Sequence, residues 1–185
     1  MKRGRSLNDI LMPLSEQTTQ ALLTQECQVA DLLEWVLQQT GPADIIQSSF
    51  SIAEEYLRRL FFMRQNKEGL IKSVELVLDH KATNKTAKLW PFILQTIERT
   101  YLADNHSKIL IVNGEKFPAA IVTSQNLTRG NRFESSIITV IPQVVGTLRQ
   151  QVIDIINKQS VPLNDIYEGT TRDGGEDGFA LHDII

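Results

Sequence analysis

Residues 106–134, HSKILIVNGEKFPAAIVTSQNLTRGNRFE, contain the pattern that decides the fold. Two runs within this stretch, Lys108–Val112 and Ala119–Thr123, are too apolar for exposed loops and predict buried strands. Asn113 and Gly114 lie between them and are a strong signal for a hairpin turn. The stretch therefore predicts an antiparallel pair of strands inside a sheet.

Polar side chains stand at the outer ends of these two predicted strands. Because successive side chains on a strand alternate between faces, His106 and Lys108 are expected to point the same way. Ser124 and Asn126 are expected to do likewise, and pairing through the turn would bring all four to one edge of an apolar sheet. A neutral imidazole can attack phosphorus, while a lysine with hydroxyl and amide donors neutralises the charge on phosphate oxygens. The pattern indicates phosphoryl transfer.

Strand and helix patterns alternate along the rest of the chain. The expected strands, besides the two above, cover residues 43–52, 72–79 and 135–141. The expected helices cover residues 15–39 (one long helix or two short ones), 55–66, 91–100 and 143–158. This alternation predicts an α/β fold, with a mixed β-sheet flanked by helices.

Length and composition predict how the chain is organised. A chain of 185 residues that is 42% hydrophobic and 22% charged fits one globular domain with a sizeable core. We expect an N-terminal helical extension over residues 1–40 and the main domain over residues 41–168. Residues 169–185, rich in glycine and acidic side chains, are expected to form a flexible acidic tail.

The apolar runs and the cysteine content of the chain indicate in which cellular compartment the protein is expected. No apolar run approaches the roughly 18 residues that a membrane span needs, and the N-terminus lacks the apolar stretch of a signal peptide. We therefore expect a cytoplasmic protein without a membrane partner. The lone Cys27 cannot form an intramolecular disulfide or a cysteine metal site, so it is interpreted as a small packing residue.

The net charge of −3 conceals an uneven distribution. Residues 58–132 carry a net charge of +7, whereas residues 1–57 and 133–185 each carry −5. A basic middle segment could surround a site for an anionic ligand, because lysine and arginine attract and bind phosphate. Chance clustering of solvated surface charges is the alternative.

The polar pattern resembles the signature of the phospholipase D superfamily, His-x-Lys-x4-Asp-x6-Gly-Ser-x-Asn. The matching residues are His106, Lys108, Ser124 and Asn126, and Glu134 stands where small nucleases of that family place a downstream acid. The sequence departs from the signature at three points. Asn113 occupies the aspartate position, Thr123 occupies the glycine position, and the spacer before Ser124 is longer.

The resemblance implies a phospholipase D-like sandwich over residues 41–168 and metal-independent phosphodiester hydrolysis through a phosphohistidine, without a cofactor. His106, Lys108, Ser124, Asn126 and Glu134 would be its catalytic residues. Family members with two signatures build one active site from both halves of a chain, whereas this chain carries one signature. A homodimer is therefore implied, with two His106 side chains facing each other. One would attack phosphorus while the other protonates the leaving oxygen.

The substrate expected from the basic middle segment is nucleic acid, DNA more than RNA. Asn131 and Arg132 either bind phosphate or belong to a solvated loop, and Glu134 either orients His106 or pairs with Arg129 or Arg132. His80 and His182 are interpreted as structural. The alternative function is a non-catalytic nucleic-acid-binding or assembly module that retains the fold, which the departures at residues 113 and 123 favour.

Overall fold

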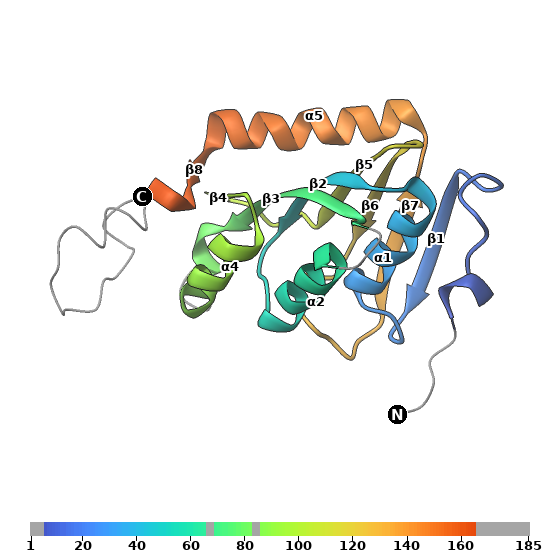
Figure 1. Cartoon of the computed structure of the whole chain (residues 1–185), viewed down its shortest axis with the longest axis horizontal. Coiled ribbons are helices and arrows are strands. Elements are labelled where there is room, and N and C mark those ends of the chain that lie inside the picture. The colour runs from blue at the N-terminus through green and yellow to red at the C-terminus, as the bar shows by residue number, and fades with distance from the viewer. Residues whose placement is uncertain (1–5, 66–68, 83–85, 166–185) are drawn as a thin grey trace, which may run out of the picture.

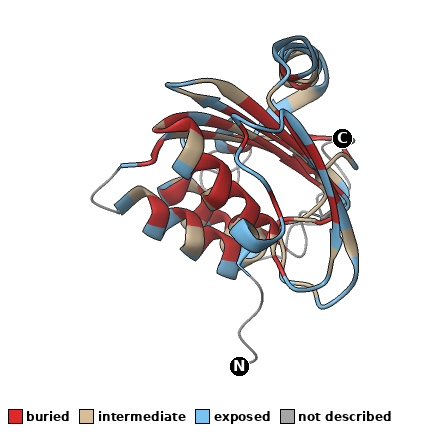
Figure 2. Ribbon diagram, turned by 90° about the vertical axis from the view of Figure 1, so that its right-hand side faces the viewer, coloured by how far each residue is buried: buried red, intermediate tan, exposed pale blue. Residues whose placement is uncertain are grey.

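The computed structural model describes residues 6–65, 69–82 and 86–165, which build one mixed sheet of eight strands flanked by helices (Figure 1). The strands are β1 (Thr19–Thr24), β2 (Ala43–Ser49), β3 (Ile71–Asp79), β4 (Arg99–Ala103), β5 (Ile109–Gly114), β6 (Pro118–Thr123), β7 (Glu134–Thr139) and β8 (Ser160–Pro162). The α-helices are α1 (Val29–Thr40), α2 (Glu54–Gln65), α4 (Trp90–Thr96) and α5 (Pro142–Gln159). Figures 1 and 2 show α1, α2 and α4 on one face of the sheet and α5 on the other, so the predicted fold class is confirmed.

The parallel and antiparallel parts of the sheet meet at β5. The strand order is β1-β7-β6-β5-β2-β3-β4-β8, in which β2, β3 and β4 run parallel and β5 pairs antiparallel with both β2 and β6. β7 and β1 continue the antiparallel part, and β8 pairs antiparallel with β4. The carboxyl ends of some strands and the amino ends of others therefore lie side by side along one end of the sheet. We call this row of strand ends the site edge. It is marked by Ser49, Asp79, Ala103, Ile109, Thr123 and Glu134.

The main core lies between the sheet and the three helices on one face (Figure 2). Alternate strand residues such as Leu76 and Leu110 face it, and leucines of the helices such as Leu33 and Leu57 pack against them, all fully buried. Each such side chain contributes roughly 1.5–3 kcal/mol by leaving water. α5 is attached more lightly, because only two of its 18 residues, Val145 and Val152, are buried.

The N-terminal segment differs from the helical pattern expected for it. α1 confirms the second part of the helix expected over residues 15–39, but the first part is strand β1. Along β1, Gln20 and Leu22 are buried while Ala21 and Leu23 are exposed, as the two faces of a strand require. These residues form a strand because they pair with β7. That strand lies more than a hundred residues away, so the local spacing of apolar residues does not reveal the pairing.

The predicted hairpin of β5 and β6 is confirmed, but its turn lies one step further along the chain. Asn113 and Gly114 still belong to β5, with Asn113 paired to Pro118, and the turn follows them. Gly114 is needed for another reason. A Cβ added to it would lie 2.4 Å from Thr40 Cβ and 2.8 Å from the Thr40 carbonyl oxygen, so only glycine lets β5 approach the end of α1 this closely.

Residues 97–100 were expected to continue a helix, and that expectation is wrong. α4 ends at Thr96, and β4 begins at Arg99 beside β3. The expected tail, residues 169–185, lies outside the described residues. Within the part of the chain that the structure describes, no helix combines the length and the apolar character needed to cross a membrane.

Gly114→Ala should destabilise the fold, because the new methyl group overlaps Thr40. Overpacking of this kind costs roughly 1–3 kcal/mol, which urea unfolding monitored by circular dichroism would measure. Gly146→Ala is the matched control, since Gly146 is exposed on α5 with open space around its Cβ position. That change should stabilise the protein by up to about 1 kcal/mol. Equal stability of Gly114→Ala and wild type would contradict the close approach.

Candidate active site

The candidate residues lie where strands begin or end at the site edge. His106 and Lys108 belong to the segment that leads from β4 into β5, and Ser124 directly follows β6. The Lys108 carbonyl oxygen accepts a hydrogen bond from Thr123 N at 3.0 Å, which ties the two segments together. The segments expected to meet at one edge therefore do meet, although His106 and Lys108 precede the strand and do not lie within it.

His106 is exposed, yet its surroundings hold it from two sides. Its ring lies against that of Phe50, with 5.2 Å between the ring centroids and 54° between the planes. Lys108 Nζ donates a hydrogen bond to the His106 carbonyl oxygen at 2.7 Å and lies 3.4 Å from His106 Nδ1. An imidazole and an ammonium group therefore sit side by side at the site edge.

Glu134 joins the site from the first position of β7. Its carboxylate accepts a hydrogen bond from Ser124 Oγ, which in turn accepts one from Ser135 N at 3.1 Å. Of the two arginine partners expected for Glu134, Arg132 is the nearer, with its Nε 3.9 Å from Glu134 Oε1. Arg129 pairs instead with Glu55 at 3.3 Å.

Charge interactions connect Lys108 with Glu134. Partial burial lowers the pKa of Lys108 below its ordinary value, and the Glu134 and Asp79 carboxylates act in the opposite direction. A partly desolvated cation binds an anion more strongly than a hydrated one, because water competes less. His106, Lys108, Ser124 and Glu134 thus form one cluster that could bind a phosphate group.

The remaining candidates contribute less to this cluster. Asn126, two residues beyond Ser124, has a buried Oδ1 without a hydrogen-bond partner among the described residues, so its amide has unused bonding capacity. Asn131 and Arg132 are exposed in the loop between β6 and β7. Within the described chain, no hydrogen bond joins the Asn131 side chain to the other candidates, so the structure leaves it apart from them.

Residues that the sequence reasoning missed support the segment carrying His106. Asn105 is buried, and its Oδ1 accepts hydrogen bonds from Ser107 N at 3.1 Å, Ser107 Oγ at 2.6 Å and Ser48 Oγ at 3.2 Å. The buried carboxylate of Asp79 accepts one from Asn105 N at 2.9 Å. The sequence does contain a signal for these residues, because they are polar and lie near the carboxyl ends of neighbouring parallel strands. Such ends meet at the same end of a sheet.

The two substituted signature positions lie in different parts of the sheet. Asn113 is exposed at the opposite end of β5 from His106, between Asp44 and Pro118. Thr123 is buried, and its Oγ1 donates a hydrogen bond to the Ser135 carbonyl oxygen at 3.1 Å, exchanges one with Ser136 Oγ at 2.8 Å and accepts one from Gln125 N at 3.1 Å. Thr123 therefore fastens the end of β6 to β7.

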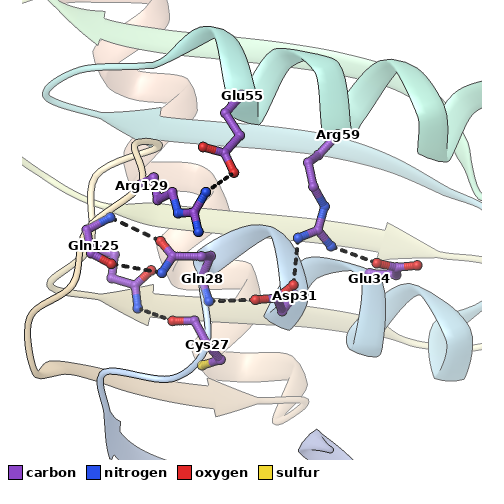
Figure 3. Close-up of polar contacts among 9 residues, drawn as sticks. Cys27, Gln28, Asp31, Glu34, Glu55, Arg59, Gln125 and Arg129 are labelled. Carbon is purple, nitrogen blue, oxygen red and sulfur yellow. Dashed lines mark hydrogen bonds and ion pairs between the residues drawn. The ribbon is translucent and has the colours of Figure 1, made fainter. Parts of the chain in front are cut away.

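The loop over residues 124–133 is anchored to the start of α1 (Figure 3). Gln28 Nε2 donates a hydrogen bond to the Gly130 carbonyl oxygen at 2.9 Å, and Gln28 Oε1 accepts one from Gly130 N at 3.2 Å. Gln125 Nε2 donates to the Cys27 carbonyl oxygen at 3.0 Å. Both glutamines restrain the loop that separates Ser124 from Glu134.

Cys27 takes part in this anchor through its backbone only. Burial, with a smaller contribution from the Asp31 charge, raises the pKa of its thiol to about 11. The thiol is therefore protonated at neutral pH and a poor nucleophile. Its interpretation as a packing residue is confirmed.

One group of described side chains has the composition of a metal site. Ligand atoms of Asp79, His80 and Asp104 lie within 4.8 Å of one another. The carboxylates have protein partners, however: Asp79 accepts hydrogen bonds from two backbone amides, and Asp104 pairs with Lys81 Nζ at 3.0 Å. These contacts account for the cluster, so we assign no metal to it.

Comparison with known proteins gives matches in structure and none in sequence. No protein-family model and no curated protein matches the chain. The fold matches Nuc from Salmonella typhimurium, a phospholipase D family member, with a TM-score of 0.56 and 17% identity over 76% of this chain and 95% of that one. It also matches NucT from Helicobacter pylori, with a TM-score of 0.55 and 11% identity over 76% of this chain and 98% of that one.

A third match is an archaeal chromatin protein, TrmBL2, whose structure shows a novel mode of DNA binding. Its TM-score is 0.52 and its identity 11%, over 77% of this chain and 53% of that one. Identities this low show a shared fold. The expected phospholipase D-like sandwich is therefore confirmed as the architecture of this chain.

Gln28→Ala should loosen the loop over residues 124–133, because it removes both hydrogen bonds to Gly130. At roughly 0.5–1.5 kcal/mol for each bond, we expect a loss of about 1–3 kcal/mol in the free energy of unfolding. Amide hydrogen exchange at Gly130 should accelerate as well. Gln25→Ala, at an exposed glutamine three positions earlier, is the control. Unchanged exchange at Gly130 would show that Gln28 does not anchor the loop.

Proposed function

We propose that this protein is a phospholipase D-like phosphodiesterase that hydrolyses nucleic acid through a phosphohistidine at a homodimer interface. The observation that carries the proposal is the meeting of His106, Lys108, Ser124 and Glu134 at one edge of a sheet with this fold. The structural similarity to a phospholipase D family member supports it. The sequence signature implies that the reaction is independent of metal.

The proposed reaction has two steps. A nitrogen of His106 attacks phosphorus, so that an N–P bond forms while the P–O bond to the leaving oxygen breaks. The partner subunit's His106, in its protonated form, gives that oxygen a proton. It then takes a proton from water as the water oxygen attacks phosphorus, and the N–P bond breaks to release the phosphomonoester. Lys108 and Asn126 bind the phosphate oxygens throughout, and Ser124 joins them when its hydroxyl proton turns from Glu134 to the phosphate.

Basic side chains around the loop over residues 124–133 support a polyanionic substrate. The side chains of Arg129 and Arg132 are 73% and 79% exposed, so both are accessible to a ligand that carries several phosphates. Nucleic acid presents such neighbouring phosphates at regular intervals, and arginine binds them well. This arrangement favours nucleic acid over an isolated small diester.

An exposed apolar sheet face supports the homodimer. β6, β7 and β1 present Val122, Ile137 and Leu23 to solvent, with 37%, 49% and 71% of each residue exposed. Ile137 lies opposite both Val122 and Ala21 in the strand register, so these side chains share the face that bears α5. Contiguous apolar surface of this kind marks protein interfaces. It adjoins the site edge, where a second copy would supply the second histidine.

A non-catalytic nucleic-acid-binding module is the second candidate function. The similarity to an archaeal chromatin protein favours it, because about half of that chain has a similar fold and its structure shows a mode of DNA binding. Such a module would use Lys108 and the exposed arginines for phosphate binding without forming a covalent intermediate. Binding with no hydrolysis is the result that would select this function over the enzyme.

The purified protein should hydrolyse bis(p-nitrophenyl) phosphate and single-stranded DNA in excess chelator. His106→Asn should abolish hydrolysis, because the amide keeps polarity but cannot form a phosphorylated imidazole. Lys108→Ala should reduce it about 100-fold or more through loss of charge stabilisation. Lys116→Ala, at an exposed lysine in the hairpin turn far from the site edge, should leave it unchanged.

Two results would contradict this prediction in different ways. Hydrolysis that survives His106→Asn, or that chelator alone removes, would indicate a contaminating or metal-dependent nuclease. DNA binding without hydrolysis of any diester would overturn the enzyme and favour the non-catalytic module.

Ile137→Asp should break the homodimer, because a buried unpaired carboxylate at the proposed interface is costly. Sedimentation should give about twice the chain mass of 20.9 kDa for wild type and the chain mass itself for the variant, with hydrolysis lost. Phe62→Asp, at a residue 68% exposed on α2 across the sheet, should remain dimeric. A wild-type monomer at micromolar concentration would overturn the composite site.

A further inference from the structure

The segment carrying His106 and Lys108 is built on a buried acidic residue. Asp79 ends β3 with only 2% of its surface exposed. A carboxylate in such a position is costly unless its oxygens are hydrogen-bonded. Asp79 Oδ1 accepts a hydrogen bond from Lys81 N at 2.7 Å, and Asp79 Oδ2 accepts one from Asn105 N at 2.9 Å. The second of these bonds fixes the residue immediately before His106.

Asn105 extends this anchor to the other side of His106. Its side-chain oxygen accepts hydrogen bonds from both the backbone and the hydroxyl group of Ser107, and its Nδ2 donates one to the Ser49 carbonyl oxygen at 3.3 Å. The residues before and after His106 are thus tied to the ends of β2 and β3. His106 itself remains exposed between two fixed neighbours.

The charge of Asp79 also acts on Lys108. Three groups surround this lysine: Glu134 from β7, Asp79 from β3, and His106 beside its Nζ. Burial lowers the pKa of Lys108, and the two carboxylates oppose that effect. Glu134 is also engaged by Ser124 and lies near Arg132. Asp79 provides its negative charge from the buried side of the segment.

We propose that Asp79 is a positioning residue of the phosphate site, which fixes the backbone on both sides of His106 through Asn105 and places a negative charge behind Lys108. This inference rests on the proposed function for the identity of the anion, but its test needs no turnover. Asp79 touches neither reacting atoms nor phosphate in this role. It acts through Asn105 and through the charge on Lys108.

The test compares Asp79→Asn with Asp104→Asn in the full-length protein. Asp104 is the matched control, because it precedes Asn105 but its side chain is 76% exposed. Two quantities are measured against pH: the titration of the Lys108 side chain by NMR, assigned with Lys108→Arg, and the affinity for tungstate as a phosphate probe.

Asp79→Asn should move the Lys108 titration to lower pH, because one of its two opposing carboxylates is gone. Tungstate binding is lost as the pH rises through the Lys108 pKa, so the variant should lose it at a lower pH than wild type. At an alkaline pH where wild type still binds, the variant should bind several-fold more weakly. Asp104→Asn should match wild type in both measurements.

Two further variants separate charge from geometry and cover a failure of Asp79→Asn to fold. Asp79→Glu keeps the charge, so Lys108 should titrate as in wild type. Ser107→Ala keeps Asp79 but removes the hydroxyl bond to Asn105, so tungstate binding should weaken several-fold at every pH while the Lys108 titration stays in place.

The inference is overturned if Lys108 titrates identically in wild type and Asp79→Asn, or if Asp104→Asn moves it equally. Tungstate affinity that is unchanged at every pH in both Asp79→Asn and Ser107→Ala would overturn the positioning role. Absence of diester hydrolysis in wild type would count against the proposed enzyme and would leave these titrations valid. The two failures are therefore distinguishable.

Discussion

The antiparallel pairing of β5 with β2 on one side and β6 on the other is the constraint on which the site depends. At β5 the sheet changes from parallel to antiparallel pairing. This pairing therefore brings the carboxyl ends of the parallel strands to the same edge as the start of β5. His106 and Lys108 enter beside that start, with Ser124 across from them at the end of β6. Gly114, at the other end of β5, permits the close contact with α1 that keeps this strand in place.

Most of the fold could be predicted from local patterns, because buried strands and amphipathic helices carry their own periodicity. β2, β3, β5, β6, β7 and α5 lie close to where the sequence places them. β1 and β4 could not be predicted in this way. Each becomes a strand by pairing with a segment that is not next to it in sequence, β7 in one case and β3 in the other. The turn after β5 was misplaced because Gly114 serves close packing instead of a turn.

The candidate site divides in a similar way. The meeting of the segments that carry His106, Lys108 and Ser124 could be predicted, because their spacing follows two recognisable strands. The buried residues behind them could not, since Asp79 and Asn105 enter the site through hydrogen bonds between segments that are distant in sequence. These buried polar groups cost little stability because each has partners. They fix the backbone on both sides of the exposed His106.

The two residues that depart from the signature, Asn113 and Thr123, belong to strands of the sheet and are not members of the side-chain cluster at the site edge. Asn113 is separated from His106 by the full length of β5, so the missing aspartate carboxylate removes nothing from the cluster at the site edge. Thr123 adds a hydroxyl group that bonds β6 to β7 directly below Ser124 and Glu134. A residue in that place holds the two strand ends in register. The same position that breaks the signature in sequence therefore helps to keep Ser124 and Glu134 in contact.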